Sequence, residues 1–439
     1  MTDDAFFSTA SEVFDWMETN CTQGIRPGLE RMEWILERLN HPERRLKFIH
    51  IAGTNGKGST AAMIASVLQE SGFPTGMFIS PYMKDWNERI SMDGQPIPEK
   101  SFVYWAGRLA PLVEEMEGDQ VTPFEFWTLV AILYFAKEAV PWFVVWETGL
   151  GGRLDSTNVV YPLVSVITNV GHDHTYILGE GISDIAQEKA GIIKPGVPVV
   201  TGCQAEALEV VELVAKEKSS KLYRLRHEFD LEVLSQGEEG GSFQFQGPFR
   251  HLEQVSVPLR GAHQLENGAV ALMTLEVLRQ YYATVMDDED ILKGMAEVDW
   301  PGRLERVARQ PEIILDGAHN QEGAEALASA IRDFRYDRLH LLIGVLEDKD
   351  VDAILRPLLP LADRVMVTGV SHHRGLDPRQ LREKALQLCP DVEIDWEPRA
   401  DKALQQLRAE ANDQDAILVT GTLFLISEIK KTLGRESSF

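Results

Sequence analysis

The chain has 439 residues, too many for one ordinary hydrophobic core, so two domains are expected. Its formal net charge of −25 excludes a protein that holds nucleic acid on a basic surface, and its three distant cysteines argue against a disulfide framework or a zinc cluster. The first residues, MTDDAFFSTASEVF, lack a signal-peptide pattern, and no apolar run approaches the ~20 residues of a membrane span. We therefore expect a cytoplasmic monomer with neither nucleic acid nor a membrane as partner.

Helical spacing of apolar residues predicts helices within residues 11–40, and the first functional signal, FIHIAGTNGKGST, follows at residues 48–60. A short apolar strand runs into a glycine turn, after which Ser59 and Thr60 open an Ala-rich helical pattern. Backbone N–H groups in such a turn and at a helix N-terminus point at a bound anion. A lysine adds positive charge there, and a hydroxyl can hold Mg²⁺.

The spacing of this turn departs from the standard P-loop, because Gly58 separates Lys57 from the first hydroxyl. A glycine turn without chemical consequence is the alternative interpretation. Three glycines, a lysine and two hydroxyls at one strand-to-helix junction favour a nucleotide phosphate site instead. The nucleotide-binding residues expected here are Gly53, Thr54, Asn55, Gly56, Lys57, Gly58, Ser59 and Thr60.

A second strand is predicted at 74–79, and the polar loop at 80–90 that follows it is either a lid over the ligand site or a merely structural loop. A buried helix is predicted over 121–137, starting near Pro123 with Thr122 as its cap. An apolar strand over 142–146 then ends at Glu147. A carboxylate at the end of a core strand suits a metal site, with a helix cap or solvated acid as the alternative.

A further strand over 163–167 ends in polar residues that include His174, and a helix over 182–189 follows. Alternating strands and helices predict a doubly wound parallel sheet with ligands at the strand ends. After a glycine-rich hairpin over 235–247 and a helix from His263, the alternation begins afresh near residue 299.

The expected fold class is therefore α/β, with two domains. Residues 1–297 would form a doubly wound P-loop ATPase domain. Residues 298–439 would form a smaller Rossmann-like α/β domain, with strands at 313–315, 339–345, 364–368 and 416–420.

The phosphate loop, Glu147, the segment 168–174 and the segment 316–320 together resemble the Mur ligase superfamily. Within it, the chain is similar over nearly its whole length to the folylpolyglutamate synthases and the bifunctional dihydrofolate synthases. The segments that carry this similarity are, in chain order, SPYMKDWNERI, ETGLGGRLDSTN, DHTYILG, QEKAGIIKPG, HQLENGAVAL, PGRLE, LDGAHN and GTLFLISE.

The resemblance implies an ATP-dependent ligase for reduced folates and L-glutamate. The γ-phosphate of ATP would activate a folate carboxylate as an acyl phosphate, the amine of glutamate would attack, and phosphate would leave as the amide forms. Phosphoryl transfer to a carboxylate brings anions together, so Lys57 and Mg²⁺, with two ions expected, must neutralise charge. Synthesis of dihydrofolate from dihydropteroate and glutamate stays open as a second activity.

The same resemblance assigns roles to single residues. The metal ligands it implies are Ser59, Glu147, His174 and Lys189. His172 lies just upstream of His174, and the Asp-His pair at 173–174 favours His174. Lys189 fits the lysine that this family carbamylates, whereas on its own it reads as an ordinary lysine at a helix C-terminus.

The second domain would close the site. Asn267 near the adenine, Arg303 on the phosphates and Asp316 against the nucleotide are the expected ATP contacts. The catalytic residues expected are Lys57, His174, Lys189 and His319. The substrate-binding residues expected are Ser80, Tyr82, Thr122, Phe124, Asp155, His319 and Asn320, the last two near the incoming glutamate.

Two other functions remain open at this point. A nucleotide-dependent switch or regulatory ATPase would need the phosphate loop and Glu147, but not His174, Lys189 or His319. Another Mur-type amide ligase, such as a cell-wall enzyme, would share the ATP site but not the folate-branch segments.

Overall fold

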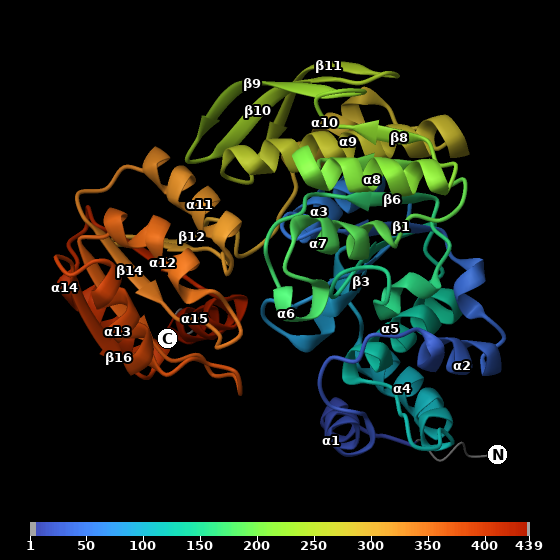
Figure 1. Ribbon diagram of the computed structural model, residues 1–439, viewed down its shortest axis with the longest axis horizontal. Coiled ribbons are helices and arrows are strands. Elements are labelled where there is room, and N and C mark those ends of the chain that lie inside the picture. Colours follow the sequence, from blue (N-terminus) through green and yellow to red (C-terminus); the bar gives the residue numbers. More distant parts are fainter. Residues whose placement is uncertain (1–5, 437–439) are drawn as a thin grey trace.

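The computed structural model describes residues 6–436 and contains two α/β units that lie side by side (Figure 1). Residues 1–5 and 437–439 lie outside the described part. The first of these ranges belongs to the N-terminal segment that lacks a signal-peptide pattern. The first unit is built on an eight-stranded sheet and the second on a six-stranded sheet, as expected for a two-domain α/β chain.

The first sheet has the strand order β4-β3-β2-β5-β1-β6-β7-β8. Its strands are β1 (Phe48–Ala52), β2 (Thr75–Phe78), β3 (Ile90–Met92), β4 (Gln95–Pro96), β5 (Phe143–Glu147), β6 (Val164–Ile167), β7 (Val199–Thr201) and β8 (Leu222–Arg224). The pairs among β2, β5, β1, β6, β7 and β8 are parallel, which confirms the predicted parallel sheet. The sequence interpretation missed the antiparallel pairs β2–β3 and β3–β4 at one edge.

Helices cover both faces of this sheet. They are α1 (Ala10–Asn20), α2 (Glu30–Arg38), α3 (Lys57–Glu70), α4 (Glu99–Glu114), α5 (Pro123–Tyr134), α6 (Thr175–Leu178), α7 (Ile182–Ala190), α8 (Ala205–Glu217), α9 (Ala262–Tyr282) and α10 (Asp288–Ala296). Because successive strand side chains point to opposite faces, Ile49 and Ile51 join a core with α3 and α9, whereas Phe48 joins a core with α1, α4 and α5. The phosphate loop between β1 and α3 is thus held by cores on both sides.

A small antiparallel sheet lies above α9 in Figure 1. Its strands, in the order β11-β10-β9, are β9 (Asp230–Gly237), β10 (Gly240–Gln246) and β11 (His251–Val257). Phe243, Phe245 and Val255 of this sheet share a core with Leu265 of α9. The predicted hairpin at 235–247 is confirmed, and β11 adds a third strand.

The second sheet has the order β12-β13-β17-β14-β15-β16, parallel except for β12–β13. Its strands are β12 (Glu305–Arg309), β13 (Glu312–Leu315), β14 (Leu339–Ile343), β15 (Arg364–Thr368), β16 (Glu393–Glu397) and β17 (Ala416–Thr420). Its helices are α11 (Gln321–Ala330), α12 (Val351–Leu358), α13 (Pro378–Leu388), α14 (Ala400–Glu410) and α15 (Leu423–Glu436). Two apolar clusters, one on each face, form its core.

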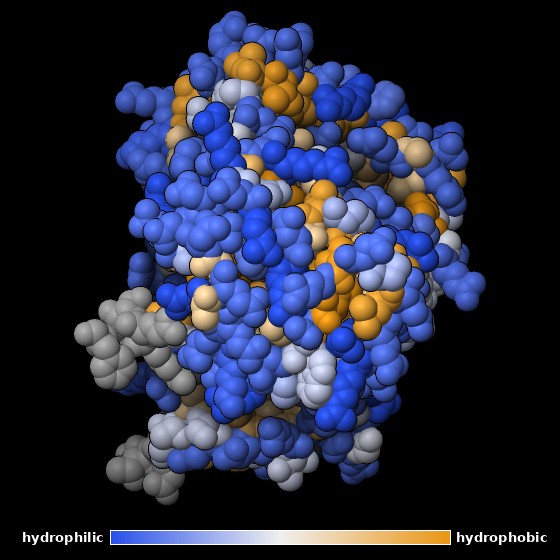
Figure 2. Space-filling view, turned by 90° about the vertical axis from the view of Figure 1, so that its left-hand side faces the viewer, coloured by the Kyte–Doolittle hydropathy of each residue, from blue (hydrophilic) through white to orange (hydrophobic). Residues whose placement is uncertain are grey.

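The surface on the side of the second sheet is mostly hydrophilic, with apolar side chains in small separate patches (Figure 2). Such a surface is expected for a chain with a net charge of −25. No helix in residues 6–436 is both long and apolar enough to cross a membrane.

Candidate active site

The phosphate loop forms the floor of a cavity of about 440 Å³ between the two sheets. Gly56 precedes α3 with a φ of 79°, in the left-handed region that glycine adopts without strain, and α3 begins at Lys57. A side chain at Gly56 would also strike Asn267, whose Oδ1 lies 2.4 Å from the position of a Cβ atom. All the loop residues predicted to bind nucleotide line the cavity except Thr60, which is fully buried within α3.

Two predicted catalytic lysines meet at the carbonyl oxygen of Gly53. The Nζ atoms of Lys57 and Lys189 each donate to this oxygen at 2.9 Å. Burial lowers the pKa of both amines, and for Lys189 burial together with the charge of Lys57 brings it to about 7. Lys189 therefore has a neutral, nucleophilic form near neutral pH, unlike an ordinary lysine at a helix end.

Glu147 ends β5 at the edge of the same cavity, as predicted. Its Oε2 accepts the Ser80 backbone N–H at 3.1 Å, and burial raises its pKa against the opposing charge of Lys57. The buried hydroxyl of Ser59 has no hydrogen-bond partner among the described residues. A hydroxyl, a carboxylate and the phosphate oxygens of a nucleotide form a donor set that suits Mg²⁺.

Within residues 6–436, no three His, Cys, Asp or Glu side chains converge to hold a metal by themselves. His174, the third predicted ligand, lines the cavity, and its buried Nδ1 has no hydrogen-bond partner in the described part of the chain. Burial lowers the pKa of His174 to about 4, so its ring is neutral at physiological pH and can coordinate a cation. His172 is half exposed and faces Glu322 instead, which supports the choice of His174.

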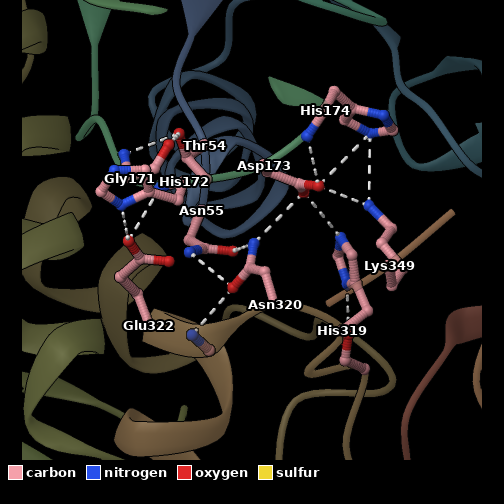
Figure 3. A network of polar contacts seen from close by, with 12 residues as sticks. Thr54, Asn55, Gly171, His172, Asp173, His174, His319, Asn320, Glu322 and Lys349 are labelled. Atoms are coloured by element: carbon pink, nitrogen blue, oxygen red, sulfur yellow. Dashed lines mark hydrogen bonds and ion pairs between the residues drawn. The ribbon is translucent and has the colours of Figure 1, made fainter. Parts of the chain in front are cut away.

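Asp173 joins the two domains (Figure 3). Its Oδ1 accepts Lys349 Nζ at 2.5 Å, and its Oδ2 lies 3.5 Å from His319 Nε2 and accepts Asn320 Nδ2 at 3.2 Å. Burial would raise the pKa of Asp173, but the hydrogen bond from His319 and the charge of Lys349 hold it well below its usual range. The carboxylate is therefore ionised, and three side chains of the second domain gather around it.

A second contact between the domains is a pair of amides. Asn55 of the phosphate loop donates to Asn320 Oδ1 at 3.2 Å, and Asn320 donates to Asn55 Oδ1 at 3.1 Å. Beside it, Glu322 Oε1 accepts the His172 backbone N–H at 2.8 Å. Asn320 also caps α11, so the helix and the domain contact depend on one side chain. Asn320 itself lines neither cavity.

The predicted nucleotide contacts Asn267, Arg303 and Asp316 line the first cavity. The two oxygens of Asp316 accept the backbone N–H groups of Leu304 and Ala318, both at 2.9 Å. Asp316 therefore also orders the connection between the domains, and burial raises its pKa.

A second cavity of about 460 Å³ adjoins the first. Residues 80–81, 149–150, His174 and His319 line both cavities, so the two meet at this point. The second cavity is also lined by the predicted substrate residues Thr122, Phe124 and Asp155. A nucleotide and a larger, partly apolar substrate would thus reach one junction from two sides.

Two of these wall residues have structural partners as well. Thr122 and Glu125 form a capping box at the start of α5, as the sequence predicts for Thr122. Asp155 accepts N–H groups from Leu150 at 2.7 Å and Thr157 at 3.0 Å, and it accepts the Thr157 hydroxyl. Tyr82, in contrast, lines neither cavity.

Comparisons with known proteins agree with this geometry. A model of the Mur ligase middle domain matches residues 51–275, and a model of the Mur ligase glutamate ligase domain matches residues 302–423. The chain is 38% identical to the dihydrofolate synthase/folylpolyglutamate synthase of Bacillus subtilis, over 97% of this chain and 100% of that relative. The chain belongs to the Mur ligase superfamily, in the branch of the folylpolyglutamate and dihydrofolate synthases.

Further members of the branch match over similar lengths. The folylpolyglutamate synthase of Lacticaseibacillus casei is 34% identical over 92% of this chain and 94% of its own. A structure of the Mycobacterium tuberculosis folylpolyglutamate synthase complexed with ADP and AMPPCP has a TM-score of 0.89 at 32% identity, covering 97% of this chain and 98% of that one. The Escherichia coli FolC complex with DHPP and ADP has a TM-score of 0.88 at 28% identity, covering 98% and 99%.

Several residues of the site were absent from the predicted set. Asp173 had a signal, because it precedes His174 at a strand end. Lys349 had a similar signal, since it follows β14 in the sequence Glu-Asp-Lys-Asp. Arg89, which lines the second cavity, had no signal that distinguishes it from a surface arginine.

Proposed function

We propose that this chain is an ATP-dependent ligase that joins L-glutamate to the γ-carboxylate of reduced folates, a folylpolyglutamate synthase. The observation that supports this most is the junction of the two cavities at His174, with Lys57 and Lys189 lining the first of them. ATP in the first cavity would present its γ-phosphate there, and the folate carboxylate would arrive from the second. Attack of that carboxylate on the γ-phosphorus releases ADP and forms an acyl phosphate, which the amine of glutamate then converts to an amide with loss of phosphate.

The chain's own residues carry the electrostatic part of this reaction. Lys57 and the N-terminal N–H groups of α3 would hold the phosphates. Ser59, Glu147 and His174 would hold Mg²⁺, which neutralises phosphate charge when bound. The contacts of Asp173 with Lys349, His319 and Asn320 would keep the domains closed and exclude water from the acyl phosphate. His319 lines both cavities at the junction, where glutamate would enter, and Asn320 would act there only through its contact with Asp173.

Lys189 is proposed to react with CO₂. The Lys189 ammonium would first lose one proton to solvent. The neutral amine would then attack the carbon of CO₂, forming a C–N bond as one C=O π bond opens, and a second proton would leave to solvent, so that a cation becomes an anionic carbamate. The lowered pKa of Lys189, about 7, supports this because the neutral amine is the reactive form. A carbamate would offer oxygen ligands to a second Mg²⁺. Carbon NMR of protein equilibrated with labelled CO₂ should show a carbamate signal that Lys189→Ala abolishes.

We place the domain boundary at residues 297/298, between the end of α10 at Ala296 and the start of β12 at Glu305. A cytoplasmic monomer remains our expectation from the sequence. Dihydropteroate, the acceptor in dihydrofolate synthesis, is proposed as a second substrate of the same cavity, since DHPP is bound in the Escherichia coli FolC complex.

The test is ATP turnover with glutamate, offering tetrahydrofolate and dihydropteroate separately and weighing the products by mass spectrometry. A glutamyl gain on tetrahydrofolate alone would establish a monofunctional folylpolyglutamate synthase, and a gain on both would establish the bifunctional enzyme. ATP binding without a glutamyl gain on either acceptor would refute the proposal and favour a nucleotide-dependent switch. Transfer to a different amine or acid would indicate another Mur-type amide ligase.

A further inference from the structure

Arg89 differs from every other lysine and arginine that lines the second cavity. The other four each lie against a carboxylate: Arg26 with Asp119, Arg153 with Glu188, Lys349 with Asp173 and Arg374 with Asp348. Arg89 has no ion pair and no side-chain hydrogen bond among the described residues, and its Nε is buried without a partner. A guanidinium with unused donors, facing a cavity in a chain of net charge −25, requires an explanation.

Aromatic rings surround this guanidinium. Its carbon lies 5.6 Å from the ring centre of Tyr82, 5.5 Å from that of Phe124 and 5.6 Å from that of Trp127. Ring faces attract a cation, but they cannot satisfy the planar fork of N–H donors. Burial lowers the pKa of Arg89 to about 10, while Tyr82 and Glu147 oppose that shift, so the group is charged at neutral pH. The guanidinium is thus positively charged and lies among three rings, while its N–H donors have no hydrogen-bond partner among the described residues.

The position of Arg89 relative to the junction narrows the choice of ligand. Arg89 lines only the second cavity, whereas the reacting carboxylate must reach the junction with the first. Phe124, which lies against Arg89, also lies directly against Gly149 of the junction, where a Cβ atom would come within 2.5 Å of its ring. The guanidinium therefore lies close to the junction but outside it. A carboxylate that is a few bonds away from the reacting one would suit this place.

We propose that Arg89 binds the α-carboxylate of the terminal glutamyl group of the acceptor, while the γ-carboxylate of the same group lies at the junction and reacts. This inference rests on the proposed function. A guanidinium binds a carboxylate through two parallel N–H···O hydrogen bonds, which fix orientation as well as position. Dihydropteroate has no α-carboxylate, so Arg89 is a specificity-determining residue that favours folylglutamates over dihydropteroate as acceptors.

The experiment compares tetrahydrofolate with its α-carboxamide analogue, which keeps the γ-carboxylate but lacks the α charge. The wild-type chain should prefer tetrahydrofolate in kcat/KM by about 100-fold, the value of a charge-assisted pair of hydrogen bonds. Arg89→Met keeps an apolar stem between the rings, should fold normally, and should abolish this preference by slowing only the reaction of the charged acceptor. Arg89→Lys retains the positive charge but not the planar set of guanidinium donors, and it should keep part of the preference for tetrahydrofolate. If the wild-type chain turns over dihydropteroate, both Arg89 variants should do so at the wild-type rate.

The control is Arg26→Met, which removes a cavity arginine already paired with Asp119 and should leave the preference at its wild-type value. Equal losses for the acid and the amide in Arg89→Met would overturn the inference and leave Arg89 with a packing role. An equal loss of preference in Arg26→Met would overturn it as well, because overall charge would then be responsible. Absence of glutamyl transfer to tetrahydrofolate in the wild type would instead refute the proposed function, so the two failures are distinguishable.

Discussion

The wall of the second cavity depends on one buried ion pair, and its removal is the most informative test of the fold around the site. Arg31 of α2 contacts Glu125 of α5 through Nε, at 3.1 Å from both carboxylate oxygens, and through Nη2 at 2.9 Å from Oε1. Their side chains are 7% and 3% exposed. Glu125 Oε2 also accepts the Thr122 backbone N–H at 2.6 Å. The pair thus holds the start of α5, which carries Phe124 into the cavity.

Arg31→Met should destabilise the first domain by about 3–5 kcal/mol, because it leaves a buried carboxylate without its partner. That loss corresponds to a fall in the unfolding midpoint of roughly 5–10 °C for a domain of this size. The KM for tetrahydrofolate should rise at least about tenfold through displacement of the cavity wall. The KM for ATP should stay constant, since α3, which follows the phosphate loop, packs in the core on the opposite face of the sheet from α5. The double variant Arg31→Met with Glu125→Met should recover only part of the stability, because Glu125→Met also removes the acceptor of the Thr122 N–H, and it should not recover the KM.

Calorimetry measures the midpoint, and steady-state kinetics measure the two KM values. The matched control is Arg399→Met, which breaks an exposed pair with Asp401 and should leave the unfolding midpoint nearly unchanged. A midpoint loss in Arg31→Met no larger than that of the control would refute the reasoning. Equal rises in the KM for tetrahydrofolate and for ATP would show that α5 supports the whole site rather than one wall.

Three further predictions concern other parts of the molecule. Asp415→Asn should cost about 1–3 kcal/mol because the buried Asp415 lies 3.2 Å from His340 Nε2. The pKa of Asp415 is lowered in the folded state. The difference in unfolding midpoint between the wild type and Asp415→Asn should therefore be largest at neutral pH and should disappear as the pH falls below about 4. Gly294→Ala should cost about 1–3 kcal/mol, measured by calorimetry, because a Cβ atom would meet the α3 backbone at Val67 at 2.6 Å. Ser59→Ala should lower kcat about 100-fold and weaken the Mg²⁺ dependence of turnover, with nucleotide binding by calorimetry retained.

Local sequence signals predicted the elements whose formation depends on neighbouring residues. The turn before Lys57 and the Thr122 cap of α5 appear in the structure because glycine conformation and capping act over a few residues. The short strands β3, β4, β7 and β8, two at each end of the first sheet, were missed, since two or three residues show no usable periodicity. β12 was missed because its alternating pattern is weak and largely polar.

The structure brings predicted residues together where strand ends converge, and it adds residues that we did not predict from the sequence where the domains meet. Glu147 and His174 were predictable, because the carboxyl ends of parallel strands share one edge. The charged segment after β14 indicates Lys349 but not its partner, because the contact of Lys349 with Asp173 joins residues 176 positions apart. The significance of Arg89 was not predictable either, because it lies in the absence of an ion-pair partner within the described residues 6–436.

The charge distribution gives these observations a common physical basis. A chain with a net charge of −25 repels ATP, folates and glutamate at long range, so attraction must come from cations near the site. Lys57 and Lys189 are held at one carbonyl oxygen despite their mutual repulsion, and Arg89 lies among rings without an ion-pair partner in residues 6–436. Each arrangement is unfavourable until an anion arrives, because burial strengthens both repulsion and attraction. The anionic substrates therefore complete the electrostatics of the site, and binding should favour the closed arrangement in which Asp173 already holds the second domain.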